Sequence, residues 1–127
     1  MDEEIILRIS KIEERARELE ENIQLIDNQL NELEIFKYTL ESVIKSKEKE
    51  ILSSLGKRVY LKAKIEDKES LFVEVGAGVI VRKTPEETLK ITKGQIQRLQ
   101  EARTEIFLRL QSYHVELQDF INSIKSN

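Results

Sequence analysis

The fold is decided by the segment Leu71-Phe-Val-Glu-Val-Gly-Ala-Gly-Val-Ile-Val-Arg-Lys83. Apolar side chains alternate at Leu71, Val73 and Val75, which is the period of a strand with one apolar face. Gly76-Ala-Gly78 then provides a small-residue turn, and an apolar run resumes at Val79-Ile-Val81. This segment is therefore predicted to be two strands joined by a glycine turn.

The residues before this segment alternate in the same way. One face carries Val59, Leu61, Ala63 and Ile65, and the polar stretch 66–70 leads from them to Leu71. We expect 59–65 to pair with 71–75 as a hairpin, and 51–55 to add a short strand before Gly56. Three to four short strands are thus predicted for a β-hairpin region at 53–84.

The region 1–52, on the N-terminal side, has a heptad pattern. Eleven of its twelve seam positions are apolar: Ile5, Ile12, Leu19, Ile26, Leu33 and Leu40 in one series, and Ile9, Ala16, Ile23, Leu30, Lys37 and Ile44 in the other. A repeat of this length predicts a coiled-coil helix.

The region 85–127, on the C-terminal side, repeats the pattern after a clear helix start. Thr84-Pro-Glu-Glu87 combines a hydroxyl N-cap, a proline at the first helical position and a glutamate at the third. Nine of the eleven seam positions that follow are apolar: Leu89, Thr92, Ile96, Leu99, Arg103, Ile106, Leu110, Tyr113, Leu117, Phe120 and Ile124. A second coiled-coil helix is predicted here.

Each predicted helix has one narrow apolar stripe, so the simplest burial is helix on helix. The predicted fold is mainly α with a small β region: a long antiparallel two-helix coiled coil joined by one or two β-hairpins. It forms one domain, divided at residues 52 and 84.

One register of this coiled coil pairs seam residues whose numbers sum to 136, and it sets Ile23 opposite Tyr113. It also places Lys37 and Arg103 within about one turn of each other, near acidic side chains that neutralise them.

The composition excludes several function classes. The 127 residues include 21 Lys or Arg, 24 Asp or Glu, one His and no Cys, so disulfides, thiolate chemistry and a zinc site are not expected. We expect no catalytic residue, no cofactor and no metal. No run approaches the ~20 apolar residues of a membrane span, and the acidic start is unlike a secretory signal. A cytoplasmic location without membrane contact is predicted.

At this point the chain resembles the prefoldin family, and within it the alpha subunit of the archaeal proteins. The resemblance rests on the segments 30–40, 54–65 and 71–83, above all Val75-Gly-Ala-Gly78 between strand-like runs with heptad helices on both sides. It covers nearly the whole chain. The sequence departs from the family at Gly56-Lys-Arg58, where a second Gly-x-Gly turn is usual.

The resemblance implies an ATP-independent chaperone, a hexamer of two alpha and four beta subunits. Its hairpins build the body, and its coiled coils hold unfolded clients and deliver them to a group II chaperonin. The hairpin positions then become assembly candidates: Val59, Leu61, Ala63, Ile65, Leu71, Val73, Val75, Gly76, Gly78, Val79 and Val81.

Apolar residues also gather at the free ends of the two helices. Ile6 and Ile121 lie off the seam but neighbour apolar seam residues, and the whole set is a candidate client-binding surface: Ile5, Ile6, Ile9, Leu117, Phe120, Ile121 and Ile124. The alternative is that these residues simply close the end of the seam.

Other off-seam apolar residues leave two interpretations open. One group lies near the hairpin region and packs either on neighbouring subunits or on the chain's own hairpins: Ile35, Phe36, Tyr38 and Val43. Phe107 and Leu108 either widen the client surface or are isolated surface residues.

Two other function classes remain. The first is a structural or adaptor coiled coil that oligomerises without binding clients. The second is a nucleic-acid binder that uses the net charge of +3 on residues 53–84. Acidic helices surround that charge and no aromatic stacking platform accompanies it, so we expect no nucleic-acid partner.

Overall fold

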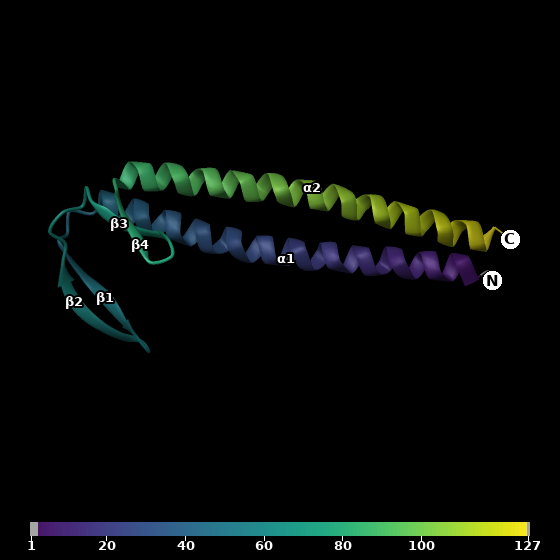
Figure 1. Ribbon diagram of the computed structural model, residues 1–127, viewed down its shortest axis with the longest axis horizontal. Helices are drawn as coiled ribbons and strands as arrows, with labels where there is room; N and C mark the ends of the chain where they lie inside the picture. Colours follow the sequence, from purple (N-terminus) through teal and green to yellow (C-terminus); the bar gives the residue numbers. More distant parts are fainter. Residues whose placement is uncertain (1–2, 127) are drawn as a thin grey trace. The chain divides into compact units, whose positions relative to one another are not determined.

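The structure is a computed structural model that describes residues 3–126. Its elements follow the chain in the order α1 (Glu3–Lys45), β1 (Glu50–Gly56), β2 (Val59–Lys64), β3 (Leu71–Gly76), β4 (Val79–Lys83) and α2 (Pro85–Lys125) (Figure 1). The predicted fold class is confirmed: two long helices have a small antiparallel β region between them in the sequence.

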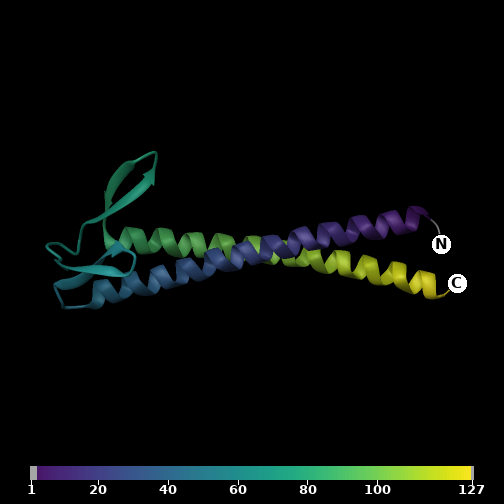
Figure 2. The same ribbon diagram turned by 90° about the horizontal axis from the view of Figure 1, so that it is seen from below.

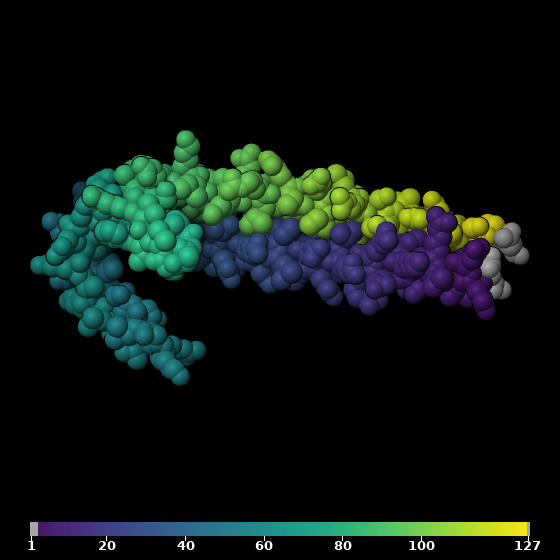
Figure 3. Space-filling model, viewed as in Figure 1, coloured from purple at the N-terminus to yellow at the C-terminus, as the bar shows by residue number. Residues whose placement is uncertain are grey.

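The chain divides into two compact units. We call Met1–Leu33 with Gln95–Asn127 the helix-pair unit, and Glu34–Gly94 the hairpin unit. In the helix-pair unit, α1 and α2 run antiparallel and side by side in both ribbon views (Figures 1 and 2). Figure 3 shows the purple-to-blue stretch of α1 in contact with the green-to-yellow stretch of α2.

The predicted seam is the buried stripe of both helices. Every one of its 23 positions is buried or half-buried, and Ile12, Ala16 and Leu110 are among the most covered side chains of the helix-pair unit. Burial of apolar area, worth about 25 cal/mol per Å², stabilises the pair along this stripe. Heptad spacing thus identified the packed face of each helix.

The predicted register is wrong by one heptad. Tyr113, expected opposite Ile23, lies near Arg15 instead and raises the pKa of its guanidinium, and Arg103 binds Asp27. The residue numbers of these two pairs sum to 128 and 130, close to 129 and seven below the predicted 136. A shift of seven residues still sets most seam residues against another seam residue, so the apolar pattern cannot choose between the two registers. In the observed one, the small Ala16 is level with Tyr113.

Helix α1 ends at Lys45, within the hairpin unit, and the predicted helical region 1–52 is therefore too long. Residues 46–49 are polar and offer no seam position, so the seam has no reason to continue. The Ser46 hydroxyl accepts a hydrogen bond from the Glu48 amide at 3.1 Å, which turns the chain into β1.

The start of α2 has the predicted capping box. The Glu87 amide donates to the Thr84 hydroxyl at 3.1 Å, and the Thr84 amide donates to the Glu87 carboxylate at 3.4 Å. Pro85 occupies the first helical position, where its missing N–H has no cost.

The strands form two separate two-stranded sheets, β1 with β2 and β3 with β4. The predicted pairing of 59–65 with 71–75 is wrong. The linker between them folds locally around Asp67, whose carboxylate accepts hydrogen bonds from the Glu69 amide and the Ser70 hydroxyl, both at 2.9 Å. Meanwhile Lys57-Arg58 forms a two-residue turn, which is the most favoured hairpin connection, and returns β2 onto β1.

The two hairpins have the same turn geometry. Lys57 and Arg58 have φ values of 52° and 64°, and Ala77 and Gly78 have 50° and 75°. Positive φ at both central residues defines a type I′ turn, and each turn follows a glycine at a register shift in the ladder. The first turn therefore keeps the shape of the second although Arg58 stands where the second has glycine.

This equivalence predicts opposite effects of two substitutions. Arg58→Gly should raise the free energy of unfolding by about 0.5–1 kcal/mol, because glycine adopts positive φ without the steric cost that a side chain has. Gly78→Ala should lower it by about 1 kcal/mol, although no atom lies within 4 Å of the added methyl position. Urea titration followed by circular dichroism measures both changes. Destabilisation by Arg58→Gly would contradict the assigned turn.

Candidate functional sites

The antiparallel pairing brings both ends of the described chain together at one end of the helix-pair unit (Figures 1 and 2). The predicted client-binding residues all lie there, and we call them the distal cluster: Ile5, Ile6, Ile9, Leu117, Phe120, Ile121 and Ile124. Five are half-buried in the seam, while Ile6 and Ile121 remain 51% and 39% exposed. The cluster is thus partly covered by helix packing and partly open.

Two shallow hollows border the distal cluster and share the Phe120 side chain. The first is lined by Glu4, Ile5, Leu7, Arg8, Lys11 and Phe120, and the second by Glu116, Asp119, Phe120 and Ser123. Each therefore combines apolar surface with charged side chains at its edge. The sequence pattern did not indicate Leu7 or Arg8, because both lie off the seam.

One ion pair fixes the two helices against each other further along the unit. Arg103 donates from Nε to Asp27 Oδ1 at 2.6 Å and from Nη2 to Asp27 Oδ2 at 3.3 Å. These hydrogen bonds lower the pKa of Asp27 below its ordinary value of 3.8. The expected proximity of Arg103 to Lys37 was tied to the wrong register, and Lys37 pairs within α1 with Glu34 at 3.4 Å.

The hairpin unit carries the predicted assembly residues, and most are open to solvent. Within each hairpin, the alternation of cross-strand pairs puts these apolar side chains on a common face. Val59, Leu61, Val75 and Val79 are each more than half exposed, whereas Ala63, Ile65, Leu71 and Val73 are half-buried. Val81 is exposed, Gly76 is the last residue of β3, and Gly78 is the second central residue of the turn that follows.

The opposite faces of the hairpins are also apolar in part, which the sequence analysis missed. Leu52 is 69% exposed and Phe72 is 73% exposed, and Tyr60 and Ile80 are also exposed. Period-two alternation assigned these positions to solvent because one covered face was assumed. A two-stranded hairpin has no core of its own, so both faces depend on a partner for cover.

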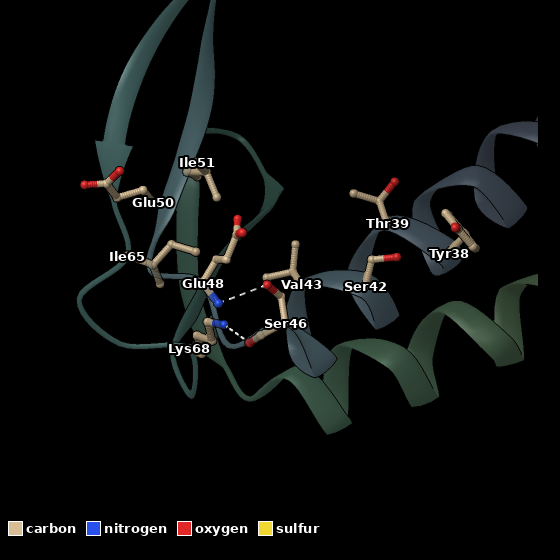
Figure 4. Close-up of a pocket in the computed structure, with 10 residues that line it drawn as sticks. All are labelled: Tyr38, Thr39, Ser42, Val43, Ser46, Glu48, Glu50, Ile51, Ile65 and Lys68. Atoms are coloured by element: carbon tan, nitrogen blue, oxygen red, sulfur yellow. Dashed lines mark hydrogen bonds between the residues drawn. The ribbon is translucent and has the colours of Figure 1, made fainter.

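The off-seam residues near the hairpins separate into two groups. Ile35, Phe36 and Tyr38 are exposed, while Val43 is half-buried and lines a hollow within the hairpin unit. Figure 4 shows this hollow, with Tyr38 and Val43 on the α1 side and Ile51 and Ile65 on the hairpin side. Phe107 and Leu108 in the helix-pair unit are exposed.

Polar contacts hold this hollow and the linker in place. The Lys68 ammonium donates to the Ser46 carbonyl at the end of α1. Arg82 of β4 donates from Nε to the Ser70 hydroxyl at 2.7 Å, and its guanidinium lies 3.9 Å from Asp67. The Glu69 amide, then Ser70 and Arg82, lower the pKa of Asp67. The linker is thereby tied to the second hairpin.

Residues 3–126 contain neither a metal-ligating cluster nor a membrane-spanning helix. No group of three or more His, Asp or Glu side chains in this range is placed to hold a metal ion. No helix in the same range is long and apolar enough to cross a bilayer.

The chain has two coiled-coil helices on either side of two β-hairpins, and the apolar faces of these hairpins are uncovered. This combination defines one class of protein subunit. Residues 12–127 match the Prefoldin family, described as prefoldin subunit, and the chain belongs to that family. The resemblance to archaeal alpha subunits is confirmed by relatives. Prefoldin subunit alpha 1 of Thermococcus kodakarensis is 32% identical over 75% of this chain, and prefoldin subunit alpha of Methanopyrus kandleri is 30% identical over 80%.

These matches cover 66% and 65% of the two relatives, so the chain spans about two thirds of their length. A solved structure described as filamentous PFD from Methanocaldococcus jannaschii has the same fold, with a TM-score of 0.76 at 21% identity. The structural match covers 90% of this chain and 95% of the Methanocaldococcus jannaschii chain.

The Asp27–Arg103 pair leads to a prediction about acid. Because the folded-state pKa of Asp27 is lowered, the pair stabilises the helix pair above pH 4, and its contribution is lost as pH falls through the folded-state value. Asp27→Asn should lower the melting temperature at pH 7, and the difference from wild type should shrink as the pH falls below the ordinary pKa of 3.8 and through the lowered folded-state value. Thermal unfolding across pH measures this. Glu32→Gln is the matched control, and a difference for Asp27→Asn that does not change with pH would contradict the assignment.

Proposed function

We propose that this chain is an alpha-type subunit of an ATP-independent cytoplasmic chaperone that captures unfolded polypeptides and delivers them to a group II chaperonin. The partners proposed from the family resemblance are beta-type subunits, in a hexamer of two alpha and four beta chains. The observation that carries the proposal is the amount of apolar surface left open on both hairpins and at the distal cluster.

Assembly with other subunits is proposed because the hairpins have uncovered apolar faces and open edges. Isolated two-stranded hairpins are at best marginally stable in water, and these have open edges as well as apolar faces. Leu61 and Val79 are more than half exposed although each lies on the apolar face of its hairpin. Strands from other subunits would cover these faces and pair with these edges.

Client capture is supported by the distal cluster. Burial of apolar surface is non-directional and depends mainly on area, so it suits a partner with no fixed sequence. The distal cluster offers a modest area on one subunit. Several such clusters on one assembly would hold one client through effective concentration.

The alternative is a structural or adaptor coiled coil that oligomerises through the same hairpins without clients. It predicts that the open distal side chains have no binding role. The expectations of no catalysis, no cofactor and no nucleic-acid partner remain predictions.

Substitution at the distal cluster separates the two functions. Ile6→Asp combined with Ile121→Asp should abolish suppression of client aggregation while leaving the mass of the assembly unchanged, since both side chains are exposed and apolar. Light scattering of a denatured client measures suppression. Leu25→Asp, at a 60% exposed position elsewhere in α1, is the matched control. Full suppression by the double variant would show that the distal cluster is not the client site, whereas absence of suppression by wild type would favour the adaptor.

Substitution on the hairpins tests assembly. Leu61→Asp should disrupt the oligomer, because a buried unpaired carboxylate costs several kcal/mol. At 57% exposure in the single chain, the substitution should leave the folding of that chain intact. Leu25→Asp, the same change at a 60% exposed position of α1 outside the hairpins, is the control. Sedimentation velocity with a beta-type subunit measures both, and an unchanged mass for Leu61→Asp would show that its face is not an interface.

A further inference from the structure

One contact in the helix-pair unit covers a residue of the distal cluster with a charged side chain of the same chain. The Arg8 guanidinium carbon lies 5.5 Å from the centre of the Phe120 ring. This is within the ~6 Å at which a cation is attracted to the negative face of an aromatic ring. Arg8 is on α1 and Phe120 is on α2, so the contact crosses the helix pair.

Phe120 has a central place among the surfaces that a client would use. Its side chain is a wall of both distal hollows, and it is the aromatic member of the distal cluster. An aromatic ring offers a client more apolar area than an aliphatic side chain does. Arg8 lines the first hollow from the other side and lies over this ring.

We propose that Arg8 is an internal competitor for the Phe120 ring, and that a client's aromatic or aliphatic side chain must displace the guanidinium to bind there. The inference rests on the proposed function. Arg8 thereby sets a threshold: a side chain that covers much of the ring replaces the guanidinium, whereas a small or weakly apolar one does not.

The displaced guanidinium needs no movement of either helix. Arg8 is an exposed residue of α1, so its side chain can leave the ring for solvent by a change of rotamer. Exposed cation–π contacts are weak, and their removal corresponds to a change in affinity of roughly 2- to 5-fold.

The test measures binding of a labelled polypeptide that cannot refold, reduced and carboxymethylated α-lactalbumin, to the assembled complex by fluorescence anisotropy. Arg8→Ala should tighten binding roughly 2- to 5-fold, and Arg8→Lys should lie between Arg8→Ala and wild type. Arg17→Ala, at an exposed position of the same helix, makes the same change of charge and should leave the affinity unchanged.

A second background separates ring competition from a general charge effect. Phe120→Leu keeps an apolar side chain but removes the ring, so Arg8→Ala added to it should produce no further tightening. Helix content by circular dichroism shows whether each variant folds.

Unchanged or weaker binding by Arg8→Ala would overturn the inference. The proposed function would still stand in that case, provided that the wild-type complex binds the polypeptide. Equal tightening by Arg17→Ala, or tightening that persists with Phe120→Leu, would overturn the inference in the same way. Absence of binding by wild type would overturn the proposed function as well.

Discussion

Each helix of this chain has a single apolar stripe, and that stripe is covered by the other helix. In the helix-pair unit, all seam positions from Ile5 to Leu33 and from Leu99 to Ile124 are buried or half-buried in this way. The hairpin unit has no comparable source of cover, because each sheet has only two strands and Leu52, Leu61, Phe72 and Ile80 stay exposed. Apolar burial is the main favourable term in folding, so a chain with this arrangement is completed by other chains. The same shortage of cover at the distal cluster leaves a surface that suits a polypeptide with no fixed structure.

The sequence predicted what depends on local periodicity and on local capping. The seam of each helix, the capping box at Thr84 and the turn that follows Gly76 depend on residues within one or two turns of one another. What it missed depends on choices between nearly equal alternatives. A coiled coil shifted by one heptad buries the same stripe, and the choice rests on particular contacts such as Asp27 with Arg103. A strand can pair with either neighbour in the sequence, and here the tight turn at Lys57-Arg58 favours β1 over β3 as the partner of β2.

The candidate sites also have one part that the sequence predicts and another part that it does not. Heptad and strand patterns place the distal cluster and the apolar hairpin faces, because both are runs of apolar residues at regular spacing. The patterns do not place Arg8 over Phe120, since that contact joins an off-seam residue of α1 to a seam residue of α2 and depends on the register. They also miss Leu52 and Phe72, because alternation assigns one face of a strand to solvent whether or not the other face has a core beneath it.

The central claim is that the hairpins are incomplete until another chain covers them. Hydrogen–deuterium exchange of backbone amides tests it directly, with the chain measured alone at low concentration and then with a beta-type subunit. The account predicts fast exchange in β1 to β4 for the chain alone, slow exchange along the helix seam in both samples, and strong protection of the four strands on mixing. Strands that are fully protected in a monomer, with no change on mixing, would contradict it.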